Sequence, residues 1–220
     1  MSYNTMAEQL ETLDQSRNQF VSNASHELKT PLTTMKILLE SLIYQPDMPV
    51  EMRTDFMTDM NHEIDRLTRI ITDLLTLTKT DDHQLTLNLK ETDLSALTRE
   101  TVRMLQPMAE QRGQTMTVKA EDTIVSLCDP ERIRQVFNNL TDNAVKYTPD
   151  GGHITVSLRK SGRNILWQVE DDGPGIPEKD RSRVFERFYR VDKARSRNTG
   201  GTGLGLSIVK QMVSLHGGTV

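Results

Sequence analysis

The chain is poor in cysteine and in aromatic residues, and each shortage excludes a class of protein. Cys128 is the one cysteine among 220 residues, which excludes an internal disulfide and a zinc site built from several cysteines. A reducing compartment such as the cytosol is therefore expected. Aromatic residues make up 5% of the chain and the formal net charge is −4, so a surface for binding nucleic acid is not expected.

Long apolar runs are also lacking. No run approaches the roughly 18 residues that a membrane-crossing helix needs, and the first four residues are polar, unlike a secretory signal. The chain contains 35% hydrophobic and 26% charged residues, which is the composition of a soluble globular protein. At this length it is expected to form one or two domains.

Two apolar stripes with helical spacing dominate the first third of the chain. The first runs from about residue 5 to residue 44 and ends before Pro46 and Pro49. The second contains Met52, Phe56, Met60, Ile64, Leu67, Ile71 and Leu74. Together they predict a helical hairpin. Because two helices leave one side of each stripe uncovered, we expect a second copy of the chain to complete a four-helix bundle.

One stretch of the first helix gathers reactive side chains. It contains His26 and Glu27, with Thr30 one helical turn further on and Pro31 directly after it. Pro31 cannot donate to the carbonyl of Glu27 and its ring crowds that turn, so a bend is expected within one turn of His26. The bend is either a tolerated kink or a hinge beside a reactive imidazole, and its position favours the hinge.

A polar, aperiodic segment at residues 79–84 indicates a domain boundary, and the pattern beyond it is mixed α/β. Asp93 and Asp129 are each placed to cap a helix; the first helix ends at Gly113 and the second opens with Pro130. The remaining elements are five strands, at residues 85–89, 116–119, 124–127, 154–158 and 165–169, and a final helix at residues 204–215.

Two amides and an ammonium share one edge of the helix that follows Pro130. Asn139 and Asn143 lie four residues apart and Lys146 lies three further on, hence on one face. Such a set can hold a hydrated divalent cation and phosphate oxygens, and Mg²⁺ accepts an amide oxygen as a single protein ligand. The alternative is an ordinary solvated helix face.

The first of two glycine clusters ends a predicted strand. Acidic residues at 170–172 lead into Gly173 and Gly175. Glycines let the backbone approach a planar ligand, and a carboxylate at the strand end can accept a hydrogen bond from an exocyclic amine. An ordinary turn is the alternative.

The second glycine cluster, at residues 200–205, leads directly into a helix. Backbone amides at such a helix start favour phosphate, although the spacing matches neither a dinucleotide-binding motif nor a P-loop. Between the clusters, Phe185, Phe188 and Tyr189 either pack a short helix onto the sheet or belong to a mobile lid. The length and charge of the segment favour the lid.

Taken together, these stretches resemble a sensor histidine kinase of two-component signalling over nearly the whole chain. Residues 25–32 resemble the H box of the family, and residues 3–10 resemble the end of a HAMP signalling linker. The other boxes follow in family order: Asn139, Asn143, Ala144, Lys146 and Tyr147 for the N box; Asp171, Gly173 and Gly175 for the first glycine box; Phe185 and Phe188 for the F box; Gly201, Gly203, Gly205 and Leu206 for the second glycine box.

The resemblance implies an α+β chain of two domains. A helical hairpin that dimerises into a four-helix bundle is followed by a GHKL-type α/β sandwich that binds ATP. The implied segments are the end of a HAMP-like helix at residues 1–14, a dimerisation and histidine phosphotransfer domain at 15–82, and a catalytic ATP-binding domain at 83–220.

The resemblance also implies a reaction. His26 attacks the γ-phosphate of Mg-ATP, and the phosphoryl group then passes to an aspartate in the receiver domain of a response regulator. A neutral imidazole suits this role at pH 7. Glu27 takes the proton from the other ring nitrogen, and Thr30 orients the water that dephosphorylates the regulator.

The nucleotide contacts are implied in the same way. Asn143 is the expected Mg²⁺ ligand, Asn139, Lys146 and Tyr147 contact phosphates or ribose, and Asp171 recognises the adenine amine. The residues expected to shape the pocket and the lid are Gly173, Gly175, Gly201, Gly203, Gly205 and Leu206.

The chain departs from the family at both ends. The family adds a strand pair and a glycine motif after residues 216–220, so the C-terminal strands are expected to be truncated. A sensor domain and membrane spans are missing at the front, so we expect a soluble cytoplasmic fragment of a receptor on the cytoplasmic side of the membrane. Membrane contact is expected only through those missing segments.

Two interpretations remain. The kinase is favoured by His26 with Glu27 and Thr30; the alternative is a dimeric module that uses ATP only to drive conformation. Of the other histidines, His62, His83 and His153 carry no predicted role, and His216 is expected to be a cation at a helix C-terminus.

Overall fold

The computed structural model describes residues 3–81, 85–191 and 201–220. The chain divides into two compact units, a first unit, Met1–Thr78, and a second unit, Lys79–Val220. Each unit has its own architecture. The predicted HAMP-like segment at residues 1–14 stays a prediction, as do the domain boundaries at residues 82 and 83.

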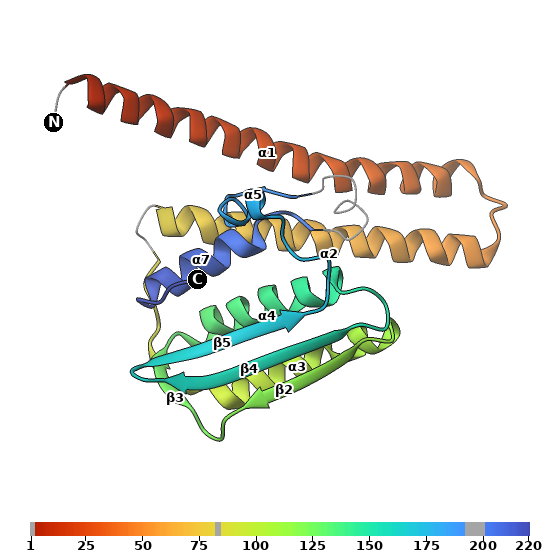
Figure 1. Cartoon of the computed structure of the whole chain (residues 1–220). Coiled ribbons are helices and arrows are strands. Elements are labelled where there is room, and N and C mark those ends of the chain that lie inside the picture. The colour runs from red at the N-terminus through yellow and green to blue at the C-terminus, as the bar shows by residue number, and fades with distance from the viewer. Residues whose placement is uncertain (1–2, 82–84, 192–200) are drawn as a thin grey trace. The chain divides into compact units, whose positions relative to one another are not determined.

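The first unit is the predicted helical hairpin, made of α1 (Tyr3–Tyr44) and α2 (Val50–Asp81) (Figure 1). The turn between the helices is closed by several hydrogen bonds. Gln45 N donates to Ser41 O over 3.1 Å, and the Arg53 guanidinium on α2 donates to Pro46 O over 2.9 Å. Met48 is buried beneath the turn, so the loop is packed as well as bonded.

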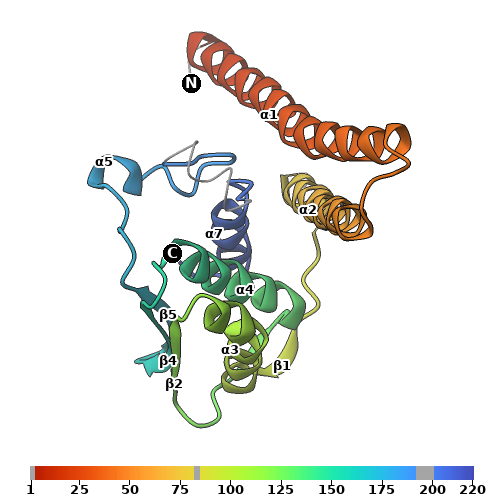
Figure 2. The ribbon, with the colours of Figure 1, turned by 90° about the vertical axis from the view of Figure 1, so that its right-hand side faces the viewer.

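Helix α1 passes through Pro31 without a break, and the proline is buried. Its ribbon is bent rather than straight (Figures 1 and 2), as an internal proline leads one to expect. Threonine hydroxyls beside it bond to carbonyls one turn back: Thr30 to His26 O at 3.2 Å and Thr33 to Lys29 O at 2.9 Å. Such bonds also favour bending. The hinge role of Pro31 stays a prediction.

The second unit alternates strands and helices. Its elements are β1 (Lys90–Asp93), α3 (Leu94–Gln111), β2 (Thr115–Ala120), β3 (Val125–Cys128), α4 (Pro130–Tyr147), β4 (His153–Ser161), β5 (Asn164–Asp171), α5 (Glu178–Arg181) and α7 (Gly205–Leu215). Strands β1 and β3 form an antiparallel pair. The larger sheet has the order β2-β4-β5, with β2 parallel and β5 antiparallel to β4.

Helices α3 and α4 lie side by side on one face of the three-stranded sheet (Figures 1 and 2). The sheet supplies Ile154, Val156 and Leu158, which are fully buried, while the residues between them are partly exposed. This alternation is the period of a half-buried strand. On β5, the Trp167 ring stacks on Phe137 of α4 with centroids 4.1 Å apart. The core therefore fixes α4, which carries the predicted N box.

One predicted strand is wrong. Residues 85–89 form no strand, because pairing with β3 begins only at Lys90, opposite Cys128. The N–H of Asn88 donates instead to the Asp129 carboxylate over 2.9 Å. Helix α2 continues to Asp81, into the polar segment at residues 79–84 where the domain boundary is predicted, and the two units divide between Thr78 and Lys79. His83 and Gln84 lie outside the described residues.

Asp129 is a buried helix cap that joins α4 to the segment before β1. Its carboxylate accepts hydrogen bonds from the backbone N–H of Glu131, Arg132 and Asn88 at 3.1, 3.2 and 2.9 Å. Burial raises the pKa of this carboxyl, but the backbone donors outweigh burial, so the pKa lies below its ordinary value. The ionised form is therefore the one that the fold stabilises.

Replacing Asp129 by alanine is expected to lower the free energy of unfolding by about 1–2 kcal/mol at neutral pH, the usual cost of losing a helix cap. Because the folded pKa is depressed, this contribution is complete above the unfolded value of about 3.9. It is lost as the pH falls through the folded pKa. Urea unfolding at neutral and acidic pH measures both effects, and a D129A chain as stable as the parent would contradict them. Asp122→Ala, at an exposed residue, is the matched control.

His216 is not the cation that the sequence suggests. Its Nε2 accepts the Asp129 N–H over 3.0 Å, and its Nδ1 lies 2.7 Å from the carbonyl of Met212. A ring nitrogen that accepts a hydrogen bond carries no proton, so Nδ1 carries the hydrogen and the imidazole is neutral. The prediction failed because the partner lies 87 residues away in the sequence.

Candidate functional site

His26 is exposed on α1 and lines a hollow of about 290 Å³ together with Lys29, Thr30, Thr33 and Thr34. These residues recur at three- and four-residue steps and therefore share one helix face. The imidazole is reachable from solvent and is surrounded by hydroxyls and an ammonium. Lys29, Thr33 and Thr34 were not predicted, although the same spacing that links His26 to Thr30 could have identified them.

Glu27 is directed to the other helix of the hairpin. Its Oε2 lies 3.8 Å from Nη2 of Arg66 on α2, and Nη1 of Arg66 lies 3.6 Å from Oε2 of Glu63. The exposed fractions of these three side chains are 16–23%. Neighbouring residues on a helix point about 100° apart, so an exposed His26 is consistent with a Glu27 that faces α2.

Helix α4 supplies the predicted N box. Asn139 Nδ2 donates to Gly205 O at the start of α7 over 3.3 Å. Asn143 is half-buried, and its side chain has no hydrogen-bond partner within residues 85–191 and 201–220. Lys146 is bound to Asp142 at 2.6 Å. Asp142 was missed, although an acid four residues before a lysine is a recognisable helix pair.

The C-terminal end of α4 is held by two side chains from residues that follow α3. Arg112 donates to the carbonyls of Val145 and Lys146, and Gln114 Nε2 donates to those of Val145 and Thr148 at 3.0 and 2.8 Å. These carbonyls have no partner inside a helix. The bonds fix the position of the turn that carries Lys146 and Tyr147, and no local sequence pattern predicts them.

The first glycine box lies against the end of α4. Asp171, the last residue of β5, accepts the N–H of Gly173 over 2.9 Å. A Cβ on Gly173 would lie 2.6 Å from that carboxylate oxygen and 3.0 Å from the carbonyl oxygen of Tyr147. Only glycine therefore allows this turn to approach the end of α4. The close approach brings Asp171, at the end of β5, near Tyr147, at the end of α4.

Asp172 ties this turn to the start of β4. It accepts the backbone N–H of His153 over 2.9 Å, and its second oxygen lies 3.1 Å from Nδ1 of the same histidine. These hydrogen bonds hold the pKa of the Asp172 carboxyl below its ordinary value. The pair positions the neighbouring Asp171, and no sequence pattern predicts it because the two residues lie 19 positions apart.

The second glycine box is bonded to the F box. Phe188 N donates to Gly203 O over 2.8 Å, and a Cβ on Gly203 would lie 2.8 Å from the backbone of Phe188. Gly203 has a φ of +73°, and Phe188 has a φ of +62°. Gly175 also has a positive φ, of +68°. Glycine is therefore required at position 203 both for its dihedral angle and for the close backbone contact.

The remaining predicted residues lie near these contacts. A Cβ added to Gly201 would lie 3.6 Å from the Tyr147 hydroxyl. A Cβ added to Gly205 would lie 3.6 Å from the side chain of Asn139. Leu206 is half-buried in the first turn of α7. The structure thus brings the N box and both glycine boxes together. Residues 192–200 of the predicted lid lie outside the described part of the chain.

The F-box segment contains a polar contact that the sequence did not reveal. Tyr189 donates to the buried carboxylate of Asp180 over 2.6 Å. This bond raises the pKa of the Tyr189 phenol above its ordinary value. The Arg183 guanidinium lies 4.3 Å from the centroid of the same ring. These contacts fold the segment back onto α5.

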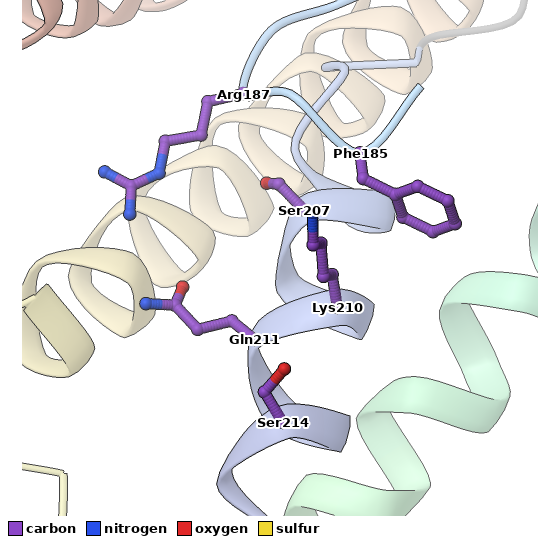
Figure 3. A pocket seen from close by; sticks show the side chains of 6 residues that line it. All are labelled: Phe185, Arg187, Ser207, Lys210, Gln211 and Ser214. Carbon is purple, nitrogen blue, oxygen red and sulfur yellow. The ribbon is translucent and has the colours of Figure 1, made fainter. Parts of the chain in front are cut away.

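A separate hollow of about 280 Å³ lies beside α7. Figure 3 shows its lining side chains: Phe185, Arg187, Ser207, Lys210, Gln211 and Ser214. Lys210 lies 6.0 Å from the ring centroid of Phe185. None of the predicted nucleotide contacts lines it, so the hollow is distinct from the convergence of the N box and the glycine boxes.

The polar side chains that converge at α4 fit a nucleotide with a magnesium ion. The Asn143 amide offers an uncommitted hard oxygen, Asp171 keeps one oxygen outside its bond to Gly173, and Lys146 supplies a positive charge. Among the described residues no group of three or more His, Cys, Asp or Glu side chains could hold a metal. Mg²⁺ accepts a single amide oxygen as its protein ligand and fills its shell with waters and phosphates, so the Asn143 amide fits this ion.

Two known protein families match the chain. Residues 16–83 match "His Kinase A (phospho-acceptor) domain". Residues 128–220 match "Histidine kinase-, DNA gyrase B-, and HSP90-like ATPase". The first match includes His26, and the second includes the N box and both glycine boxes.

Comparisons with individual proteins also identify histidine kinases as similar to this chain. The chain is 39% identical to the sensor histidine kinase WalK of Bacillus subtilis over 96% of its own length and 35% of WalK. The solved histidine kinase AdeS of Acinetobacter baumannii matches with a TM-score of 0.70 and 27% identity over 86% of each chain. A structure of the histidine kinase ThkA with the response regulator TrrA matches in fold, with a TM-score of 0.71, 21% identity, and coverage of 96% of this chain and 57% of ThkA.

The chain spans about a third to a half of the length of the curated relatives that it matches. Among the helices that the structure describes, none combines the length and the apolar character needed to cross a bilayer.

Proposed function

We propose, on the premise that this chain belongs to the family of sensor histidine kinases, that it is a protein-histidine kinase. It transfers the γ-phosphoryl group of ATP to His26 and then to an aspartate of a response regulator. Phosphatase activity toward that regulator is the second part of the proposal.

One observation carries the proposal. The chain combines an exposed histidine, set among hydroxyls and an ammonium on a helical hairpin, with a separate unit whose N box and glycine boxes converge. A nucleotide-binding unit alone does not need a solvent-reachable imidazole on another unit. A phosphoryl acceptor does.

The proposed first step is the transfer of the γ-phosphoryl group from ATP to a ring nitrogen of His26. One ring nitrogen attacks the γ-phosphorus, an N–P bond forms, and the bond from that phosphorus to the β,γ-bridging oxygen breaks. ADP leaves with the electron pair. The proton on the other ring nitrogen passes to the carboxylate of Glu27 and then to water.

The second unit holds the nucleotide. Asp171 accepts from the adenine amine, and Asn139, Lys146 and Tyr147 bind phosphates or ribose. Asn143 is the ligand of Mg²⁺, which when bound neutralises charge on the phosphate oxygens. Lys146 is bound to Asp142 in this structure, so we propose that it exchanges that carboxylate for a phosphate oxygen. Glycines 173, 175, 201, 203 and 205, with Leu206, shape the pocket and its lid.

The second step transfers the phosphoryl group to the regulator. The N–P bond breaks, an oxygen of the regulator's aspartate bonds to phosphorus, and the imidazole regains a proton. For the phosphatase step we propose that Thr30 orients the attacking water. Its hydroxyl hydrogen is donated to His26 O, which leaves its oxygen able to accept from water.

Two partners complete the proposal. Exposed apolar residues remain along both helices of the hairpin, including Ile37, Ile43, Met57 and Leu75, and a second copy would cover them in a four-helix bundle. A monomer in sedimentation experiments would contradict the homodimer. The other partner is a receiver domain, and the cytoplasmic side of the membrane stays the predicted location.

The test is incubation with Mg²⁺ and ATP labelled at the γ-phosphorus. A phosphohistidine label is lost in acid and kept in base, whereas a serine or threonine phosphoester survives acid. ATP labelled at the α-phosphorus is the control and should leave no label. Nucleotide binding without any protein label would contradict the kinase. That outcome would favour the alternative, a module that uses ATP only to change conformation.

A further inference from the structure

We propose that Asp180 is a positioning residue for nucleotide binding, and that it acts through the hydroxyl of Tyr189. The bond between these side chains holds the F-box segment, residues 185–190, against Gly203 of the second glycine box. The inference rests on the proposed function, since it assumes that the second unit binds the nucleotide. It assigns a role to two residues that are not among the predicted nucleotide contacts.

The first observation is a short hydrogen bond inside the second unit. The Tyr189 hydroxyl donates to Oδ1 of Asp180 over 2.6 Å. Asp180 is 7% exposed and lies in α5, before the F-box segment. The bond raises the pKa of the Tyr189 phenol above its ordinary value, so the phenol remains the donor at neutral pH. A hydrogen bond to a carboxylate is stronger than one between neutral groups.

Arg183 strengthens the link between α5 and the F-box segment. Its guanidinium lies 4.3 Å from the centroid of the Tyr189 ring, a distance at which a cation is attracted to an aromatic face. Its backbone N–H donates to the carbonyl of Asp180 over 2.9 Å. The ring is therefore held at its face by Arg183 and at its hydroxyl by Asp180.

The same segment contacts the second glycine box through its backbone. Phe188 N donates to Gly203 O over 2.8 Å. A Cβ added to Gly203 would lie 2.8 Å from the carbonyl carbon of Phe188 and 3.0 Å from the carbonyl oxygen of Tyr189. The backbone that the Tyr189 side chain anchors is therefore the backbone against which Gly203 packs.

Gly203 lies between this contact and the N box. Two residues later, the carbonyl of Gly205 accepts from the Asn139 amide over 3.3 Å. Two residues earlier, a Cβ added to Gly201 would lie 3.6 Å from the Tyr147 hydroxyl. Without the buried hydrogen bond, the contact at Gly203 loosens. Only the molecules that keep the glycine box in place then bind the nucleotide fully, so the apparent affinity falls with their fraction.

The test is the affinity of the full chain for a fluorescent ATP analogue in Tyr189→Phe. This variant keeps the ring and its contact with Arg183 and removes only the hydroxyl. We expect the dissociation constant to rise about tenfold, the scale of one hydrogen bond to a charged group, and KM for ATP to rise with it. The kcat at saturating ATP should stay within about twofold of the parental value. An unchanged affinity would overturn the proposal.

Two variants of the acceptor test the same bond from its other end. Asp180→Asn keeps an oxygen that accepts from the phenol and should recover most of the affinity. Asp180→Ala removes the acceptor and should match Tyr189→Phe. In the double variant the two losses should not add, because each removes the same bond. A loss of about a hundredfold in that chain, the product of two independent effects, would overturn the proposal.

The matched control is Glu178→Ala, at an exposed acid of the same short helix, which should keep the parental affinity. The number of nucleotide sites per chain separates positioning from a loss of fold. A positioning defect weakens the affinity and leaves that number unchanged, whereas unfolding lowers the number and the melting temperature. A Tyr189→Phe chain with fewer sites of parental affinity would overturn the positioning role.

These outcomes are distinguishable from a failure of the proposed function. A parent chain that binds the analogue and is labelled on His26, together with an unchanged affinity in Tyr189→Phe, overturns the positioning role alone. A parent chain that binds the analogue but takes no label overturns the kinase. A tenfold weaker binding in Tyr189→Phe would then still support the role of Asp180, because the readout is binding.

Discussion

Replacing His26 by alanine is expected to abolish the acid-labile phosphoryl label completely. The imidazole nitrogen is the atom that bonds to phosphorus, and alanine offers no nucleophile. The His26 side chain is exposed and makes no hydrogen bond within the described residues, so the variant should fold like the parent chain. Label incorporated from γ-labelled ATP, measured beside a circular dichroism spectrum, separates loss of chemistry from loss of fold.

His62→Ala is the matched control for that experiment. His62 is also exposed and also lies on a helix of the first unit, so its loss should leave labelling at the parental level. His153 and His216 are less suitable, because their rings are engaged by Asp172 and by the Asp129 N–H. An acid-labile label that persists in H26A, or disappears in H62A, would assign the phosphoryl group to another residue.

Replacing Asn143 by alanine is expected to lower the rate of His26 phosphorylation by at least about 100-fold. The variant removes the proposed protein ligand of Mg²⁺, and a metal ion supplies several kcal/mol of charge stabilisation in such a transfer. The free energy of unfolding should change little, because the amide has no hydrogen-bond partner among the described residues. Initial rates of labelling at saturating ATP measure the first effect, and urea unfolding measures the second.

A binding measurement tests the same assignment without catalysis. In the parent chain, Mg²⁺ should strengthen the binding of a fluorescent ATP analogue, and chelation of the metal should weaken it. In N143A the affinity should be insensitive to Mg²⁺. Asn164→Ala, at the exposed start of β5, is the control and should keep the metal dependence. A metal response in N143A equal to that of the parent would exclude Asn143 as the ligand.

Asn139 gives a useful contrast with Asn143. Its amide nitrogen donates to Gly205 O, so the side chain joins α4 to α7 while its oxygen is left for another contact. The two asparagines lie four residues apart on one helix face, and the sequence does not separate their roles. Asn139 therefore connects two elements besides its proposed contact with the nucleotide, whereas the amide of Asn143 has no partner among the described residues and is the candidate metal ligand.

The sequence by itself determined the elements whose causes are local. The helical hairpin follows from apolar spacing and two prolines, and the caps at Asp93 and Asp129 follow from side chains that bond to the next turn. The family follows from five short motifs in a fixed order. Each of these features depends on residues close together in the chain.

Only the tertiary structure decided the contacts between distant residues. The strand predicted at residues 85–89 fails because Asn88 bonds to Asp129 instead of to a neighbouring strand. His216 is neutral because a backbone N–H from residue 129 points at its ring. Glu27 meets Arg66 across the hairpin, 39 positions further on the chain. No periodicity encodes these pairs, because each depends on which faces the folded backbone brings together.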